Sequence, residues 1–407
     1  MIRWLPVAAL TAVVAPLTGI GAQNTRPNTP RQPPVSSRGI LPVTGCAGQP
    51  ISDVVVITQP PYTERLPRRF EFLRRAARTL HVTTLDEVIR RYLLVHRGEP
   101  CDQIRRAESE RVLRAQPFLV DARIRAYDDG EGGVRLEVET RDEFSTVFEP
   151  TIAAKSPMFR GMRLGEGNLG GTARLAAVEW REGLAYHDVL GAQYQDFQFG
   201  GGRNELRVNG ARLPRGQELR AEVVRPYYTD LQRFAFVASV DGTRDYFQFR
   251  RPIEPGNAIN LAQRSAVIGG ITRIGSRGRL KLVGLSLTHS ASHVDSTTVV
   301  IDRTGFQRDT GEALGRRYRG QNVVRANALA GIRLMRFTPV QGFDALTGTQ
   351  DIRVGLQVGA VYGQAIGIGA ARDRDRFMAS GLYAGAGNAK MFVGTQWIGE
   401  ARNDQGA

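Results

Sequence analysis

The stretch from Leu85 to Pro150 decides the fold. It begins LDEVIRRYLLVHRGEPCDQIRRAESERVLRAQ (85–116) and, after Pro117, continues FLVDARIRAYDDGEGGVRLEVETRDEFSTVFEP (118–150). Apolar residues recur at helical spacing in the first half and alternate with polar residues in the second. No convincing helical pattern returns after Phe144. The order predicts a small α+β module directly before a long run of strands.

Elements on both sides complete this module. The β-branched run 51–57 ends at Pro60-Pro61 and predicts a strand, while 68–80 carries apolar residues at helical spacing. Thr84 is the expected N-cap of the helix that starts the opening stretch, and Asp102 the N-cap of the next. The glycine-rich turn 128–133 then joins two strands. The predicted order is β-α-α-β-β, with an extra turn or helix, the segment 68–80, near its start.

The N-terminus predicts export. Arg3 precedes an apolar run over 5–20, and small residues follow up to Ala22, so residues 1–22 are expected to be a signal peptide. A retained membrane anchor is the alternative, although the apolar run is shorter than the usual span of about 20 residues. Residues 23–46 are rich in proline and polar residues, which predicts a disordered tether.

The net charge of +15 comes almost entirely from arginine, because the chain has only three lysines. The arginines alternate with apolar residues, as over 203–212, and do not form one block. Spread along strands, they would face a water-filled lumen or lipid headgroups. This distribution disfavours nucleic acid as a partner.

Cys46 and Cys101 are the only cysteines, and both belong to the module. An oxidising compartment would permit a disulfide between them, and two unrelated thiols are the alternative. Val43-Thr-Gly-Cys46 faintly resembles a lipidation box, but Pro42 and the polar tether separate it from the apolar run.

The remainder predicts an antiparallel transmembrane β-barrel over 143–407. Gly, Asp, Asn and Pro punctuate short alternating runs, and the expected non-strand gaps at 155–170, 252–262 and 290–320 leave room for roughly 12–14 strands. A soluble β-sandwich is the alternative. The runs lie at 174–180, 186–194, 218–224, 233–239, 246–250, 280–287, 323–337, 352–362 and 391–397.

Several motifs resemble a known family. In the module, Gly98–Asp102, Glu108–Phe118 and Val120–Ile124 resemble the pattern of a POTRA domain. In the strand-rich part, Gly167–Thr172 looks like the early turn between the first two barrel strands of the BamA/TamA-type bacterial surface antigen superfamily. Val224–Thr229 looks like an element that follows a few strands later. The resemblance implies a POTRA-like periplasmic domain over 47–142, followed by an outer-membrane barrel.

Two departures stand beside this resemblance. The family's Arg-Gly-Phe/Tyr element is not matched, since Gln341-Gly-Phe343 and Arg319-Gly-Gln321 each lack one member. The chain ends on Glu400–Ala407 and not on an aromatic-ended strand. The sequence is therefore interpreted either as a shortened member of the family or as an incomplete chain.

The resemblance implies a factor for outer-membrane protein assembly or translocation, not an enzyme. Its partners would be unfolded outer-membrane or secreted clients and the lipid of the bacterial outer membrane. A client strand would add to a free sheet edge by β-augmentation. The residues expected to bind it are Val134, Leu136, Val138 and Thr140. Alternatives are a passive anion-selective pore lined by arginine, or a structural protein whose module is a spacer.

The sequence offers no active site. Gly165–Gly170 matches a dinucleotide-binding pattern, but a strand and not a helix is expected after it. His289 and His293 lie in a Ser/Thr-rich stretch and not on one helix face. No catalytic residue, metal ligand or cofactor-binding residue is predicted.

Overall fold

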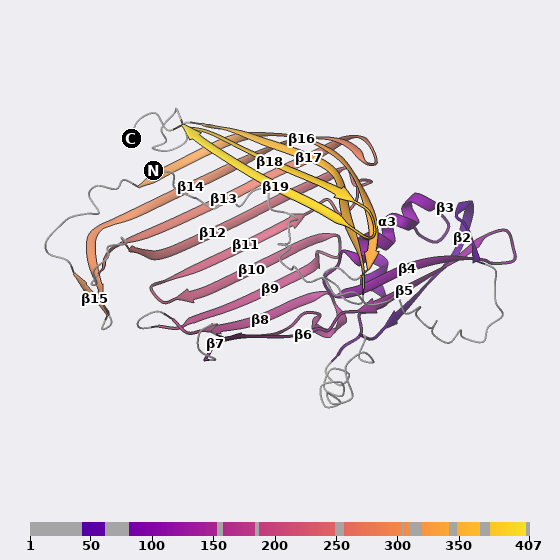
Figure 1. Cartoon of the computed structure of the whole chain (residues 1–407), viewed down its shortest axis with the longest axis horizontal. Helices are drawn as coiled ribbons and strands as arrows, with labels where there is room; N and C mark the ends of the chain where they lie inside the picture. Colours follow the sequence, from indigo (N-terminus) through magenta and orange to yellow (C-terminus); the bar gives the residue numbers. More distant parts are fainter. Residues whose placement is uncertain are drawn as a thin grey trace.

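The computed structural model describes residues 43–61, 81–152, 158–183, 187–248, 256–302, 305–308, 320–341, 348–366 and 375–403. These residues form two sheets, a small one in the N-terminal module and a large one in the rest of the chain. The module lies at one end of the large sheet (Figure 1). The predicted fold class, an α+β module followed by a long antiparallel sheet, is confirmed.

The module contains a five-stranded mixed sheet with the order β1-β4-β5-β2-β3. β5 pairs with β4 in the antiparallel sense and with β2 in the parallel sense. The described elements keep the predicted β-α-α-β-β order, with two short strands added. They are β1 (Val43–Thr44), β2 (Ala47–Gln59), α2 (Asp86–Tyr92), β3 (Pro100–Asp102), α3 (Gln103–Arg114), β4 (Leu119–Asp128) and β5 (Val134–Asp142).

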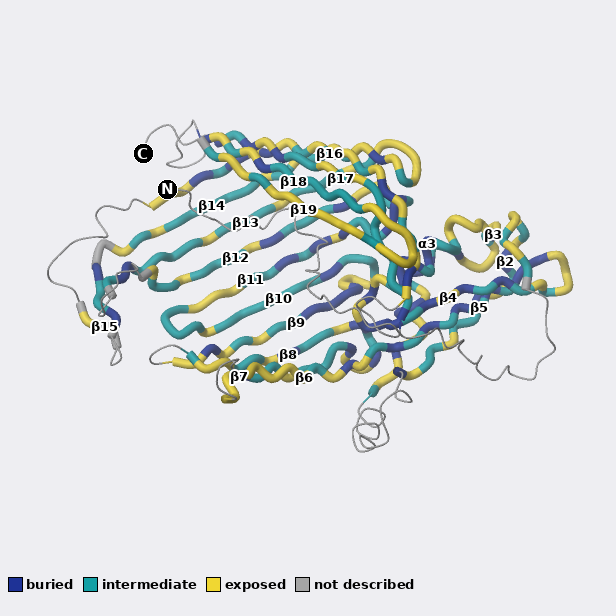
Figure 2. Tube along the Cα trace, viewed as in Figure 1, coloured by how far each residue is buried: buried dark blue, intermediate teal, exposed yellow. Residues whose placement is uncertain are grey.

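The helices of the module bury one face against this sheet. Asp102 starts α3 as predicted, because its carboxylate accepts hydrogen bonds from the backbone N–H groups of Ile104 and Arg105. Val112 and Leu113 on α3 are fully buried against the alternate residues of β4 and β5. The contiguous hydrophobic core therefore lies in the module and at its contact with the large sheet, whereas buried positions along the large sheet are scattered (Figure 2).

The large sheet has 14 strands, and consecutive strands pair in the antiparallel sense from β6 to β14 and from β16 to β19. It curls round on itself (Figure 1). Its strands are β6 (Thr146–Ile152), β7 (Phe159–Glu166), β8 (Arg174–Arg181), β9 (Val189–Phe199), β10 (Asn204–Leu213), β11 (Gly216–Arg225), β12 (Phe234–Gln248), β13 (Gly256–Ser276), β14 (Arg279–Asp302), β15 (Gly305–Arg308), β16 (Gln321–Gln341), β17 (Thr349–Ala365), β18 (Arg376–Gly387) and β19 (Phe392–Asn403). We call this sheet the barrel sheet.

The two faces of the barrel sheet differ in chemistry. Exposed apolar side chains occupy one face, among them Val178 (60% exposed), Ile268 (62%) and Leu285 (72%). The opposite face carries polar and charged residues, as at Arg207 of β10 and Glu222 of β11. An apolar outer face and a polar inner face are typical of a sheet that encloses a polar lumen and faces lipid.

Several predicted boundaries are wrong. β7 occupies half of the predicted gap 155–170, β13 begins inside 252–262, and β14 and β15 continue into 290–320. The runs 233–239 and 246–250 belong to one long strand, β12, as far as residue 248. Glycine, serine and threonine dilute the alternation in these segments, so the apolar pattern ends before the strand does.

Two further predictions differ at the module. Val43 and Thr44, placed in the tether, form β1 by pairing with Tyr127 and Ala126. Thr84 does not cap α2, because its N–H and hydroxyl bind Asp142 and Asn168. The signal peptide 1–22, the tether up to residue 42 and the helix 68–80 lie outside the described residues. In the part of the chain that is described, no helix is long and apolar enough to cross a bilayer.

Candidate functional site

The predicted client-binding residues lie in the centre of the module sheet. Val134, Leu136, Val138 and Thr140 are all buried in β5. β4 and β2 flank β5 on its two sides along nearly its whole length. No backbone group on these residues faces an open edge, so the prediction that they form the client-binding edge is wrong. Alternation identified the strand but not its place in the sheet.

The open edge belongs to β4. On one side β4 pairs with β5 along its length, but on the other side β1 reaches only Ala126 and Tyr127. Within the described residues, no strand covers the rest of that side. An unpaired strand edge is a template for another extended chain unless other groups cover it.

Three side chains of α3 cover this edge. Ile124 donates its N–H to Glu110 Oε1 at 2.8 Å, and its carbonyl accepts from Arg106. Arg114 donates to the carbonyl of Ala122 at 3.3 Å. Arg106, Glu110 and Arg114 therefore satisfy the backbone groups that a neighbouring strand would otherwise satisfy. We call these three residues the edge cap.

The edge cap forms one wall of a groove of about 650 Å³. The opposite wall comes from the barrel sheet, where Pro339, Val340 and Gln341 of β16 approach the module. Arg123 and Arg125 of β4 also line the groove. An open strand edge thus lies beside the end of β16 and the start of β17.

The helix α3 is fastened to the inner wall and turns of the barrel sheet. Arg114 donates to both carboxylate oxygens of Asp351 on β17, at 2.8 and 2.9 Å. The guanidinium of Arg111 lies 4.1 Å from the ring centroid of Phe337 on β16 and donates to the carbonyl of Tyr228. Charge-assisted and bidentate contacts of this kind fix geometry strongly.

Glu108 is the most enclosed charge in this contact, with a side chain only 2% exposed. It accepts from Arg111 of its own helix, from Thr229 of the β11–β12 loop at 2.7 Å, and from Arg277 of the β13–β14 turn at 3.0 Å. Burial by itself raises the pKa of Glu108, but the hydrogen bonds and charges of Arg111, with Thr229 and Arg277, lower it overall. Glu108 is thus held as a carboxylate between module and barrel sheet.

An apolar cluster extends across the same boundary. Tyr92 of α2 packs against Phe118 and, edge-on, against Tyr228, while Phe118 packs against Phe197 of β9. The hydroxyl of Tyr92 donates to the carbonyl of Phe197 at 2.9 Å. Burial raises the pKa of Tyr92 well above its ordinary value, so the hydroxyl remains a donor. The module and barrel sheet therefore share one core.

The β7–β8 turn makes a third attachment. Gly171, at a φ of +72°, accepts a hydrogen bond from the N–H of Leu85 at 3.0 Å. A Cβ at this glycine would lie 2.2 Å from the carbonyl oxygen of Thr83, so no larger residue fits without displacement. Nearby, burial raises the pKa of Asp142 despite hydrogen bonds from Thr84 and His81.

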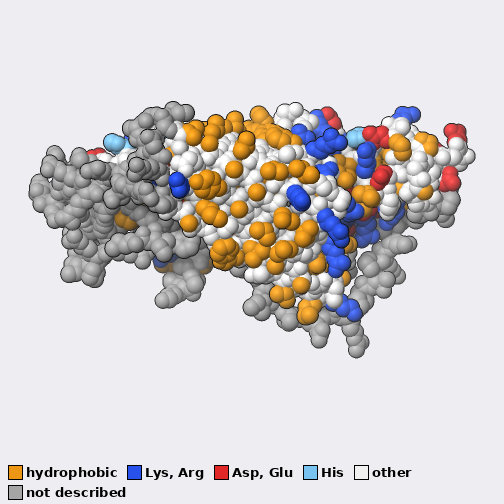
Figure 3. All heavy atoms as spheres, turned by 90° about the horizontal axis from the view of Figure 1, so that it is seen from above, with side chains coloured by type: hydrophobic (Ala, Val, Ile, Leu, Met, Phe, Trp, Pro, Cys, Tyr) orange, Lys and Arg blue, Asp and Glu red, His pale blue; other side chains and the backbone are white. Residues whose placement is uncertain are grey.

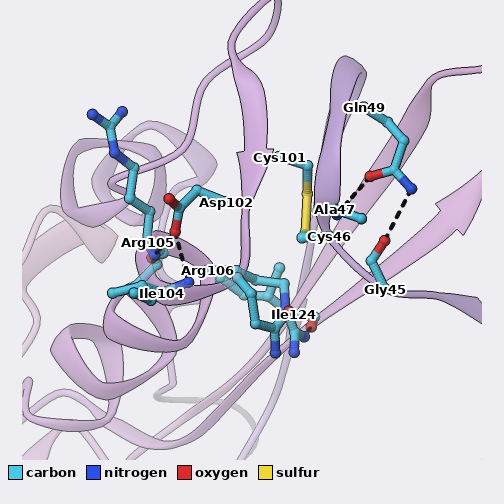
Figure 4. The surroundings of a disulfide bond; sticks show 12 residues. Gly45, Cys46, Ala47, Gln49, Cys101, Asp102, Ile104, Arg105, Arg106 and Ile124 are labelled. Atoms are coloured by element: carbon cyan, nitrogen blue, oxygen red, sulfur yellow. Dashed lines mark hydrogen bonds between the residues drawn. A yellow bond between two sulfur atoms is a disulfide. The ribbon is translucent and has the colours of Figure 1, made fainter.

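The two cysteines lie at the far side of the module from this contact. Cys46 and Cys101 are joined by a disulfide, which links the residue before β2 to the residue before Asp102 (Figure 4). The bond therefore ties the approach to the sheet directly to the start of α3.

The described residues contain no cluster of three or more His, Cys, Asp or Glu side chains that could hold a metal ion. His289 binds Asn322 at 2.8 Å. Gly165 lies in β7, and Gly170 and Gly171 form a turn before β8, so the dinucleotide-like sequence is a strand and its turn. That turn joins the second and third strands of the barrel sheet, one connection later than the family resemblance implied.

Sequence reasoning missed the edge cap. Arg106, Glu110 and Arg114 are spaced four residues apart, with alternating charge, and so lie on one helix face. That spacing could have shown that they act as a row. It could not have shown that the row lies along β4, because this depends on the order of strands in the sheet.

Neither a family model nor a curated protein matches the chain. Among solved structures, it is similar to the crystal structure of BamA from Haemophilus ducreyi lacking POTRA domains 1-3. The sequence identity is 10% and the TM-score 0.36, over 87% of this chain and 56% of that one. It is also similar to CdiB from Acinetobacter baumannii, at 9% identity and a TM-score of 0.26, over 88% of this chain and 68% of that one. The chain thus spans little more than half of the BamA structure.

Proposed function

We propose that this protein is an outer-membrane assembly or translocation factor. Its module, on the periplasmic side, receives an extended client at the edge of β4 and passes it to the barrel sheet. The observation that carries the proposal is this edge. Beyond its pairing with β1 at Ala126 and Tyr127, side chains of α3 cover it among the described residues, and it opens into a groove shared with the barrel sheet. Side chains can rotate away from an edge, whereas a paired strand leaves only after its backbone hydrogen bonds break.

The outer face of the barrel sheet supports a place in the membrane. Apolar side chains cover it broadly (Figure 3). Aromatic pairs lie near both ends of the strands: Phe234 packs on Phe236 near the module, and Phe159 on Trp180 near the opposite end. An apolar band between aromatic girdles is the surface that a lipid-embedded barrel presents.

Backbone pairing suits a receptor for many clients, because it binds backbone N–H and C=O groups that all clients share, whatever their side chains. A client strand that replaces the edge cap would pair with Ala122 and Ile124. It would then lie against β16 and β17, since these strands form the opposite wall of the groove. Capture and transfer thus require no movement of the module away from the barrel sheet.

The ends of the barrel sheet offer a second place for a client strand. In the described part of the chain, β6 pairs only with β7, and β19 only with β18. Each has an edge that could accept a new strand. Energy for the transfer would come from folding of the client and its insertion into lipid, because the sequence offers no nucleotide-binding site.

Strand addition can be tested with peptides from the last strand of an unfolded outer-membrane barrel protein. The full chain carries a photo-cross-linker at Arg123 in the groove or, as a control, at Glu137 on β5. We expect cross-linking at Arg123 alone. Methylation of alternate backbone amides on one edge of the peptide should abolish it, whereas methylation on the other edge should not. Equal capture of both methylated peptides, or preferential capture at Glu137, would contradict the proposal.

The passive anion-selective pore gains less support from the inner wall. Arg207 pairs with Glu205 at 2.5 Å and with Glu222 at 3.1 Å, and Arg220 pairs with Glu222 at 2.8 Å. Carboxylates thus neutralise these arginines, which weakens their attraction for anions. In addition, α3 lies against Phe337 and Asp351 on the inner face of the barrel sheet, so part of the module stands in the way of an open pore there.

A further inference from the structure

The outer face of the barrel sheet carries exposed basic residues at its module end. Arg279 and Lys281 begin β14, Arg336 lies near the end of β16, and Arg225 ends β11. All four are exposed. They lie on the same strand face as apolar neighbours. Val283 and Leu285 follow Lys281 at every second position, and Leu334 and Ile332 precede Arg336 in the same way. They therefore continue the outward-facing rows toward the module.

Register brings three of these residues together. Lys281 lies opposite Ile332 of β16, and Arg336 lies one outward position beyond Leu334 on the same strand. Arg279 lies one outward position before Lys281. We call Arg279, Lys281 and Arg336 the basic cluster, with Arg225 on its flank. In Figure 3, Lys and Arg side chains gather between the apolar face and the module.

Among the residues that the structure describes, the basic cluster has no counter-charge. None of its residues, nor Arg225, forms an ion pair with a residue that the structure describes. This distinguishes them from Arg174, which also faces outward but pairs with Asp196 at 3.1 Å. Strand positions beside the cluster are apolar or neutral, with Ile274 opposite Lys281 and Val354 opposite Arg336. An unpaired row of cations attracts anions from outside the protein.

We propose that the basic cluster binds the phosphate groups of anionic phospholipids in the leaflet on the module side. The inference rests on the membrane placement in the proposed function, but not on client capture. The apolar residues Val283, Leu285 and Leu334 contact acyl chains, and the guanidinium and ammonium groups reach the headgroup level. Basic side chains at this level attract anionic lipid, and each is worth about fivefold in affinity.

The full chain is purified in bilayer discs made from equal amounts of phosphatidylglycerol and phosphatidylcholine with identical acyl chains. The ratio of the two lipids that stay bound is then measured. One variant combines Arg279→Gln, Lys281→Gln and Arg336→Gln. A matched control combines Arg90→Gln, Arg97→Gln and Arg105→Gln, which remove the same charge from the module. Inorganic phosphate is added in a separate arm to distinguish a lipid headgroup from a free anion.

We expect phosphatidylglycerol to be enriched around the unmodified chain and around the control. The cluster variant should lose at least fivefold of this enrichment while still inserting into the discs. Enrichment that is absent from the unmodified chain, or that survives in the cluster variant, overturns the proposal. So does complete displacement by inorganic phosphate, which would indicate a general anion site. A chain that enters no bilayer overturns the membrane placement too, which separates the two failures.

Discussion

The two strands of the module hairpin have nearly the same sequence pattern but opposite positions. β4 and β5 both alternate buried and partly exposed residues, and they pair with each other. β5 has a strand on each side, whereas the edge cap alone covers most of the outer edge of β4 within the part of the chain that the structure describes. One strand therefore builds the core and the other offers an interface. The difference comes from the neighbours of each strand and not from its own residues.

The largest effect should come from the core strand. Leu136→Ala in β5 removes a fully buried side chain and should lower the free energy of unfolding by about 4 kcal/mol. Arg123→Ala in β4, where the side chain is half exposed, should change it by less than about 0.5 kcal/mol. Urea unfolding of the full chain in lipid discs, followed by proteolysis of the module, measures both. Similar losses in the two variants would contradict the distinction between the strands.

A smaller effect should come from the charge that holds α3 against the barrel sheet. Glu108→Gln leaves Arg111 without its buried carboxylate partner and should lower the free energy of unfolding by about 3 kcal/mol. Glu87→Gln is the matched control, since Glu87 pairs with Arg91 on an exposed surface and should cost less than about 0.5 kcal/mol. The same urea experiment measures both variants.

The effect of Glu108 should depend on pH in one direction. Its folded pKa lies below the ordinary value of 4.5, so the folded state binds its proton less readily than the unfolded state. The stabilisation is therefore fully present above that value and is lost as the pH falls through the folded pKa. The difference between the unmodified chain and Glu108→Gln should shrink on acidification below about pH 4.5. A difference that stays constant would show that the carboxylate charge is not what matters.

The smallest effect should be on the affinity of the β4 edge for a client peptide. Glu110→Ala frees the N–H of Ile124 and should tighten binding of the client peptide by about fivefold, equal to one hydrogen bond of about 1 kcal/mol. Glu99→Ala removes a carboxylate that pairs with Arg105 elsewhere in the module and should leave binding unchanged. Fluorescence anisotropy with a labelled peptide measures the affinity. Weaker binding by Glu110→Ala would mean that the edge cap contacts the client and does not compete with it.

The sequence predicted the module elements well because each has a strong local signal. Asp102 is a good capping residue before an amphipathic segment, and the glycine-rich turn 128–133 separates two alternating runs. The barrel sheet was harder to delimit. β18, which no predicted run covers, is rich in glycine and alanine, so it has almost no hydrophobic contrast between its faces. Pairing with β17 and β19 makes it a strand.

The functional site was predicted less well, for a physical reason. A sheet edge is defined by the absence of a neighbouring strand. The neighbour that covers one edge of β5 is β2, which lies more than seventy residues earlier in the sequence. Alternation over 134–140 carries no information about that neighbour. The attachment of Glu108 to Thr229 and Arg277 is also long-range. Its only local sign is a carboxylate on the same helix as Val112 and Leu113.

The disulfide has a mechanical consequence. Cys46 and Cys101 connect the chain before β2 to the three residues that lead into α3 (Figure 4). A pull on the chain ahead of Cys46 would pass through the sulfur atoms to the N-terminus of α3, and β2 would carry only part of it. The load would arrive at the helix whose contacts with the barrel sheet include Glu108 with Arg277 and Arg114 with Asp351. Tension from that end would thus be transmitted to the barrel sheet without first unfolding the module.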